Sequence, residues 1–132
     1  MWLDQTLLEI WNLGMVMKLT RCQLRQQGKN PDWVYWNVTV KTARIEHQCM
    51  APTWTMVNAI KKRATSEDIY TTMYRAILNG NKDQILIQIK KEIEKGTQVL
   101  AFVCYCPDNT FCHTYLLIDW LLEQMPELQR LE

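Results

Sequence analysis

One stretch, Gln98 to Met125, constrains the fold of this chain more than any other. It begins with an unbroken apolar run, Val99 to Val103, which is typical of a strand buried on both faces in an α/β sheet. A turn-rich loop that carries cysteines follows. Apolar side chains then recur on one helical face, at Leu116, Leu117, Trp120 and Leu121. The stretch therefore predicts a central strand, a loop and a helix.

The loop brings Cys112 and His113 to the start of the predicted helix, just beyond the carboxyl end of the predicted strand. Ligands of open α/β sheets bind at this position. The first turn of a helix also offers free N–H groups and a partial positive charge. We therefore expect a functional site at Cys112 and His113.

Further strands are predicted upstream. Residues 15–24 mix apolar and basic side chains, and apolar residues alternate with others from Val34 to Lys41, as in a strand with one buried face. Turn-forming residues within 26–32 indicate that these two strands form a hairpin. A fourth strand is expected near residues 44–49.

Helices separate these strands from the central one. The segment Thr65 to Asp68 matches a capping box, and a second helix is predicted from about Lys82 to a cap at Gly96. We expect each helix to turn one apolar face inward: Ile69, Met73 and Ile77 in the first, and Ile85, Ile89 and Ile93 in the second.

The order of elements predicts an α/β fold, in which a small central sheet has helices packed on it and a strand-loop-helix unit ends the chain. We expect a single domain over residues 15–132. Residues 1–14 carry leucines and a tryptophan at helical spacing, so they are expected to form a helical extension that could join two copies of the chain into a homodimer.

Composition excludes several classes of protein. Fifteen Lys and Arg against fourteen Asp and Glu leave a net charge of +1, so we expect no nucleic acid as partner. No apolar run approaches the ~20 residues of a membrane span. Five cysteines and the absence of a signal peptide indicate reduced thiols and a cytoplasmic protein.

Cys104, Cys106, Cys112 and His113 form the densest group of reactive side chains, and several interpretations are open. Thiolates and imidazoles bind zinc. The spacing argues against a metal site, because Cys-x-x-Cys pairs are absent and two consecutive helical residues diverge by about a hundred degrees. We therefore expect no metal and no cofactor.

A second interpretation makes Cys112 an activated nucleophile. A helix N-terminus and a neighbouring imidazole both lower the pKa of a thiol. His113 would act as the base, and Asp108 or Asp119 would orient it. A purely structural role, with the thiols as small buried apolar groups, is the remaining alternative.

A third interpretation is a non-covalent anion site. The loop and the first turn of the helix would bind phosphate or carboxylate, with Asn109 and Thr110 as cap or ligand. If the fold brings Lys41, Thr42 and Trp54 beside this loop, they would add a cation for phosphate and an indole for a nucleobase.

The stretch from Val99 to Glu123, with Cys-Tyr-Cys at 104–106 and Phe-Cys-His at 111–113, resembles the C-terminal signature of the domain of unknown function 488 family of bacteriophages and bacteria. Segments 38–42 and 51–54 and the helix bearing two tyrosines resemble that family in the same order. The resemblance covers residues 15–125 and implies a compact α/β domain without an established activity.

Two positions depart from the family pattern. A basic residue usually follows Cys-His in the family, whereas Thr114 stands here, which weakens the case for an anion site. The preceding turn usually contains glycine and here reads Asp108-Asn109-Thr110.

We therefore expect a phage-type α/β protein that binds a small anionic, nucleotide-like ligand at the loop from Cys104 to His113. One alternative is a thiol-dependent enzyme that uses Cys112 and His113. Another is an interaction protein that inhibits a host component through its tryptophans and residues 1–14. A phage-encoded chain would act in the host cytoplasm.

Overall fold

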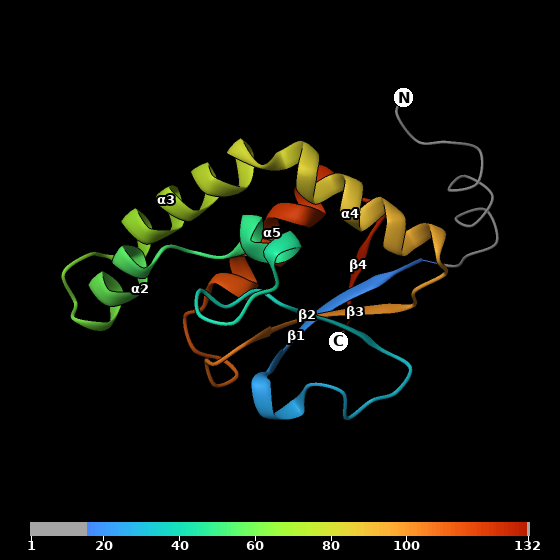
Figure 1. Ribbon diagram of the computed structural model, residues 1–132. Helices are drawn as coiled ribbons and strands as arrows, with labels where there is room; N and C mark the ends of the chain where they lie inside the picture. The colour runs from blue at the N-terminus through green and yellow to red at the C-terminus, as the bar shows by residue number, and fades with distance from the viewer. Residues whose placement is uncertain (1–15, 132) are drawn as a thin grey trace.

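The computed structural model describes residues 16–131, which contain a parallel sheet with helices on one face (Figure 1). The described part of the sheet has the strand order β2-β3-β1-β4. Its strands are β1 (Lys18–Gln23), β2 (Val34–Asn37), β3 (Val99–Cys104) and β4 (Gln129–Arg130). The α/β fold and the central position of the apolar strand are confirmed. The predicted helix at 1–14 lies outside the described residues.

The predicted hairpin is wrong. β1 and β2 do not pair with each other; both pair with β3, and both run parallel to it. The connection between them, which includes η1 (Leu24–Gln26), crosses to the face of the sheet opposite the helices (Figure 1). Trp33 and Tyr35 pack there against Cys22, Ala101 and Val103. An apolar strand such as β3 needs cover on both faces, and this connection covers the second one.

β2 is shorter than the alternating pattern predicts, because a polar turn ends it at Asn37. The Asn37 side chain accepts hydrogen bonds from the backbone and hydroxyl of Thr39, at 3.0 and 2.8 Å, and donates one to Thr42 Oγ1 at 2.7 Å. Asn and Thr side chains commonly replace strand pairing in this way. Val38, at 0% exposure, is thereby held at the end of the sheet.

The helical layer is formed by η2 (Ile45–Met50), α2 (Trp54–Lys61), α3 (Glu67–Gly80), α4 (Lys82–Glu94) and α5 (His113–Gln124). Thr53 and Ser66 cap α2 and α3 by accepting from the third backbone N–H beyond them. α4 buries Ile85, Ile89 and Ile93 as predicted, and Gly96 takes a positive φ of 83° where the chain turns into β3. No helix among these described residues is long and apolar enough to span a membrane.

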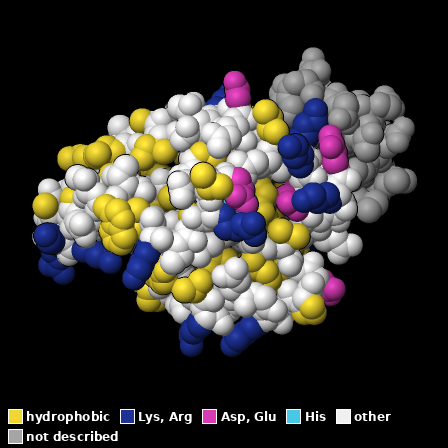
Figure 2. Space-filling view, in the orientation of Figure 1, with side chains coloured by type: hydrophobic (Ala, Val, Ile, Leu, Met, Phe, Trp, Pro, Cys, Tyr) yellow, Lys and Arg dark blue, Asp and Glu magenta, His cyan; other side chains and the backbone are white. Residues whose placement is uncertain are grey.

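The predicted inward face of α3 is wrong at Ile69 and Met73, whereas Ile77 is partly buried and packs against the core. Ile69 is 55% and Met73 46% exposed, whereas Tyr70, Tyr74 and Leu78 are buried. The tyrosines are buried instead because their rings offer more apolar area, and the Tyr74 hydroxyl donates to the Met50 carbonyl at 2.7 Å. Hydrophobic side chains consequently remain on the surface over α2 and α3 (Figure 2).

The fourth strand is not where we expected it. Residues 45–50 form the short helix η2, whose His47, Cys49 and Met50 turn inward. The edge strand is instead β4, which pairs with the start of β1 over two residues. A strand of two residues is too short to leave a periodic pattern in the sequence.

Candidate functional site

A cavity of about 300 Å³ opens beside the loop that follows β3. Apolar and aromatic side chains line most of it, as in small-molecule sites. All four residues of the predicted cluster also line it, so the fold brings them to one ligand-sized space. Its lining residues are Thr39, Val40, Pro52, Val57, Ile60, Lys61, Tyr70, Cys104, Tyr105, Cys106, Phe111, Cys112 and His113.

Cys112 and His113 point toward each other although they are consecutive. Cys112 is the N-cap residue of α5 and has an extended backbone, with φ −155° and ψ 145°. The helical divergence that we expected therefore does not apply to it. Its Sγ lies 3.7 Å from His113 Nδ1, so the sulfur and the imidazole form a pair at the cavity.

A backbone carbonyl fixes the tautomer of His113. His113 Nε2 lies 2.8 Å from the carbonyl oxygen of Val38, and because a carbonyl only accepts, Nε2 must carry the proton. The lone pair is then on Nδ1, which faces Cys112. Burial lowers the pKa of His113, and this outweighs the opposing effect of the Val38 carbonyl. His113 is therefore a neutral base in contact with a thiol.

The prediction that Asp108 or Asp119 orients His113 is wrong. Asp108 forms an ion pair with Arg21, and Asp119 forms one with Arg130. The group that orients His113 comes instead from the segment after β2, 75 residues upstream. A backbone carbonyl carries no side-chain signature, so the sequence offers no signal for it.

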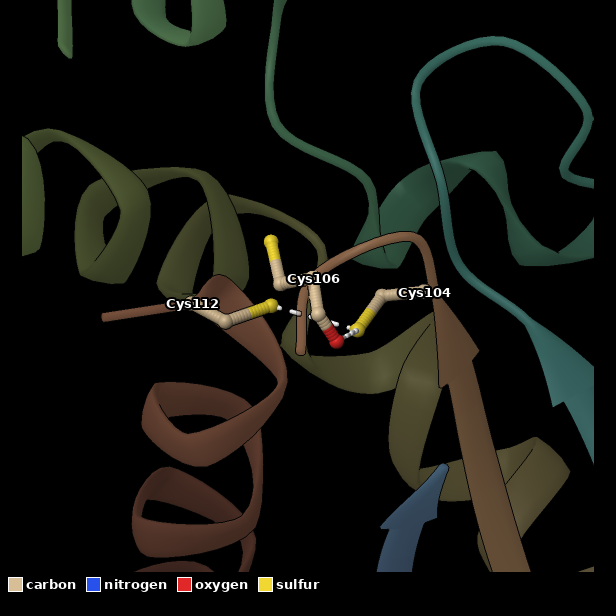
Figure 3. A group of neighbouring side chains, drawn as sticks. All are labelled: Cys104, Cys106 and Cys112. Carbon is tan, nitrogen blue, oxygen red and sulfur yellow. Dashed lines mark hydrogen bonds between the residues drawn. The ribbon is translucent and has the colours of Figure 1, made fainter. Parts of the chain in front are cut away.

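The three cysteines form a sulfur cluster around Cys112 (Figure 3). The sulfur atoms of Cys104 and Cys112 are 3.3 Å apart, and the Thr114 hydroxyl donates to Cys112 Sγ at 3.3 Å. All three sulfurs, including that of Cys106, lie within 4.8 Å of one another. Such crowding favours one shared negative charge over three.

Arg21 supplies the matching positive charge. Its side chain is 5% exposed, and its Nη2 donates to Cys104 Sγ and to the Cys106 carbonyl, each at 2.6 Å. Its Nε donates to Thr114 Oγ1 at 3.3 Å. Burial acts to lower the pKa of Arg21, but the sulfurs of Cys104 and Cys112 raise it overall. The cluster therefore contains a permanent cation.

Arg21 is the main residue that sequence reasoning missed. It lies within β1, where an arginine among buried residues was the available signal. Its Nε donates to Thr114, which occupies the position where the family resemblance leads us to expect a basic residue.

The neighbours of each thiol set its pKa. The hydrogen bond with Cys104, then that with Cys106, lowers the pKa of Cys112 despite its burial, and Thr114 adds to the effect. The bond with Cys104 raises the pKa of Cys106. Burial raises the pKa of Cys22 to about 11. These effects favour the negative charge on Cys112.

The cluster could also hold a metal ion, since its three sulfurs are near enough to share one. Our argument from spacing was wrong on this point, because the loop folds back and brings Cys112 to the strand end. Arg21 already places a positive charge beside Cys104. The absence of a metal stays a prediction.

The other predicted site residues lie outside the cavity lining. Asn109 and Thr110 are exposed and bond within the local structure: the Asn109 backbone N–H donates to the Tyr115 hydroxyl, and Thr110 Oγ1 donates to the Pro107 carbonyl. Lys41 and Trp54 are exposed on other segments, with Trp54 52% exposed on α2.

Thr42 lies nearer to the cavity, with its hydroxyl 3.2 Å from that of Tyr105, which lines it. The sequence also gave no indication that Lys61, Tyr70 and Phe111 line the cavity. Tyr70 and Phe111 meet edge to face, with ring centroids 5.2 Å apart. They form an aromatic wall to which Lys61 adds a cation.

Comparison with known proteins assigns the chain to a family. A family model matches residues 18–125 and is described as the active DUF488-N3 subclade, DUF488-N3a. No curated protein and no solved structure matches the chain. The match covers β1, which carries Arg21, and extends through the cysteine loop and α5. The chain therefore belongs to the DUF488-N3a family.

Proposed function

We propose that this protein is a cysteine-dependent enzyme in which Cys112 is the nucleophile and His113 the general base. The observation that carries the proposal is the pairing of Cys112 Sγ with His113 Nδ1, at 3.7 Å, beside a ligand-sized cavity. The Val38 carbonyl orients the base, as the third group of a catalytic triad does. The description of the family as an active subclade agrees with a working catalytic site.

The chemistry follows from the charges around Cys112. Arg21 and Thr114 stabilise a thiolate, which attacks an electrophilic atom of the substrate, so that a bond to sulfur forms and the bond to the leaving group breaks. His113 then takes a proton on Nδ1 from a water molecule that attacks this intermediate, and the bond to sulfur breaks to return the Cys112 thiolate. All five cysteines are free, and cysteines without disulfides are typical of cytoplasmic proteins, which supports a cytoplasmic location.

The substrate class follows from the lining of the cavity. Tyr70, Tyr105 and Phe111 offer aromatic surface, and Lys61 offers a cation. A small molecule with a flat ring and an anionic group, such as a nucleotide, would satisfy both. A volume of about 300 Å³ admits a molecule of this size only in part, so its polar end would lie toward solvent.

The test is alkylation by iodoacetamide, a reagent small enough to enter the cavity, followed by peptide mass spectrometry at each cysteine over a range of pH. We expect Cys112 to react with an apparent pKa well below the ordinary value of about 8.5. Cys22, with its pKa raised to about 11, is the internal control. An apparent pKa of Cys112 at or above about 8.5 would contradict the proposal.

A second candidate function is non-covalent binding of the same nucleotide-like anion, and the position of Lys61 in the cavity lining favours it. Thermal-shift measurements with nucleoside monophosphates, nucleosides and inorganic phosphate would test it. We expect the monophosphates to give the largest shift and Lys61→Met to reduce it. Lys62→Met is the matched control, because Lys62 is exposed and does not line the cavity.

The variant Cys112→Ala separates the two functions. If the ligand is only bound, this variant keeps the thermal shift, and no covalent adduct forms on the native protein. If Cys112 is the nucleophile, incubation of the native protein with a reactive nucleotide analogue leaves an adduct on Cys112 that the variant lacks. A protein that gives neither shift nor adduct with any nucleotide would exclude this substrate class.

A further inference from the structure

Cys104 has a position that the proposed function does not require. Its sulfur lies 3.3 Å from that of Cys112, and both residues line the cavity. Two thiols at this distance need to approach by little more than 1 Å to form a disulfide bond of about 2.05 Å. Cys104 is therefore placed to react with whatever forms on Cys112.

We propose that the cysteine cluster reduces organic hydroperoxides, with Cys112 as the attacking thiol and Cys104 as the resolving thiol. This inference rests on the proposed function, because it needs the same reactive Cys112. It goes further in naming a second activity, its substrate class and a role for Cys104.

The first step forms a sulfenic acid. The Cys112 thiolate attacks the terminal oxygen of the hydroperoxide, so that an S–O bond forms and the O–O bond breaks. The leaving alkoxide takes a proton from solvent and departs as an alcohol. Cys112 has then been oxidised by two electrons and the hydroperoxide reduced by two.

The second step forms a disulfide. The Cys104 sulfur attacks the Cys112 sulfur, an S–S bond forms, the S–O bond breaks, and the hydroxide leaves as water with the proton of Cys104. Together the two steps convert two thiols and one hydroperoxide into a disulfide, an alcohol and water. A dithiol, such as dithiothreitol, returns the pair to its reduced state by thiol–disulfide exchange.

The surroundings of Cys104 support this role. Arg21 donates to Cys104 Sγ at 2.6 Å, and this contact holds the Cys104 sulfur 3.3 Å from that of Cys112. Arg21 also bonds to the Cys106 carbonyl and Thr114 Oγ1, so it remains anchored when Cys104 is oxidised. Cys106 also lies within 4.8 Å of the other sulfurs, and the separation of 3.3 Å between Cys104 and Cys112 makes Cys104 our candidate for the resolving thiol.

The lining of the cavity points to an organic peroxide. Val57, Ile60 and Phe111 present apolar surface next to the cysteines. Burying a phenyl group against such a surface contributes free energy that hydrogen peroxide cannot gain. We expect cumene hydroperoxide to oxidise the pair about tenfold faster than hydrogen peroxide, which corresponds to about 1.4 kcal/mol.

The experiment oxidises the reduced full chain with one equivalent of cumene hydroperoxide or of hydrogen peroxide. Intact mass spectrometry follows the loss of two hydrogen atoms, and non-reducing peptide mapping locates the disulfide. We expect a bond between Cys104 and Cys112 that dithiothreitol reverses, with Cys22 and Cys49 still reduced.

Variants test the assignment of the resolving thiol. Cys104→Ser is expected to stop at a sulfenic acid on Cys112, which dimedone traps, and Cys104→Ala serves as a second variant if the first misfolds. Cys49→Ser is the matched control, because Cys49 is buried but does not line the cavity, and it should still form the disulfide. A bond between Cys106 and Cys112 would overturn the role of Cys104, and equal rates for both peroxides would overturn the organic substrate class.

Failure of this inference is distinguishable from failure of the proposed function. Iodoacetamide is added to a parallel sample of the same reduced protein. Rapid alkylation of Cys112 without any disulfide would overturn the peroxide activity and leave the nucleophile in place. Slow alkylation together with no disulfide would overturn both.

Discussion

Two histidine–cysteine pairs lie buried in this protein, and only one of them has neighbours that make a thiol reactive. Cys112 contacts a histidine, a hydroxyl and a second thiol that Arg21 holds. Cys49 has only weak contacts, with the Glu46 carbonyl at 3.4 Å and with Gln88 Nε2 at 3.7 Å. Burial is common to both cysteines, so burial does not decide reactivity.

The two histidines differ in the same way. His113 Nε2 is held by the Val38 carbonyl, and its ring meets Tyr74 edge to face. His47 stacks on Trp36 with ring centroids 4.6 Å apart, and its Nδ1 has no partner among the described residues. Burial lowers the pKa of both histidines, and it raises the pKa of Cys49. A fixed tautomer and a nearby cation distinguish the candidate site from an ordinary buried pair.

The largest expected effect is the difference in stability loss between the variants His113→Ala and His47→Ala. His113→Ala leaves a cavity and an unpaired Val38 carbonyl, so we expect the free energy of unfolding to fall by about 4 kcal/mol. His47→Ala leaves a cavity without a lost hydrogen bond, and we expect about 2 kcal/mol. Urea denaturation measures both values. Equal losses would contradict the structural role of the Val38 contact.

Replacing the buried Arg21 should abolish the difference in thiol reactivity between Cys112 and Cys49. In Arg21→Met, the pKa of Cys112 should move toward about 8.5, which leaves about 1% thiolate at pH 6.5. Alkylation of Cys112 at that pH should then slow by up to about 100-fold, while that of Cys49 stays unchanged in the same sample.

The control for this variant is Arg130→Met, which removes an exposed arginine that pairs with Asp119. We expect it to change neither alkylation rate and to alter stability by less than about 0.5 kcal/mol. Unchanged Cys112 alkylation in Arg21→Met would show that the cation does not act on that sulfur.

Acidification should act on both histidines. Because burial lowers the pKa of each in the folded state, the unfolded chain binds more protons below its own histidine pKa of about 6.5, and stability falls as pH falls. Between pH 6.5 and 5.5 each histidine should cost up to about 1 kcal/mol. His113→Gln and His47→Gln should each remove the part of this loss that its own histidine causes, measured by urea denaturation at both pH values. An unchanged slope in both variants would contradict the neutral state of these imidazoles.

The smallest expected effect concerns the Thr114 hydroxyl. Thr114→Val preserves shape but removes the O–H that donates to Cys112 Sγ, so the pKa of Cys112 should rise by about half a unit to one unit. Alkylation at a pH well below that pKa should slow about three- to tenfold. Thr114→Ser keeps the hydroxyl and should retain most of the reactivity. A faster reaction in the valine variant would contradict this contact.

The sequence predicted the local parts of the site. The apolar run that became β3, the loop and the start of α5 lie within one continuous segment, so their patterns were sufficient to place Cys112 and His113 at a cavity. The buried isoleucines of α4 were predicted for the same reason, because helical spacing alone identifies that face.

The non-local parts could not be predicted. Arg21 reaches Cys104 from 83 residues upstream, and Val38 reaches His113 from 75 residues upstream. Strand order decides both contacts, and a hairpin between β1 and β2 fits the same local patterns as the parallel arrangement observed. On α3, hydrophobicity alone favoured isoleucine over tyrosine, and the hydroxyl partners that reverse this choice come from other elements.

The central claim is that Cys112 carries the negative charge of the sulfur cluster. Thiolate absorbance in the ultraviolet, titrated against pH in the native protein and in Cys112→Ser, measures this directly. We predict that the difference between the two proteins shows one thiolate already present at about pH 6, below the ordinary thiol pKa of about 8.5. A difference signal that appears only at or above about pH 8.5 would contradict the account.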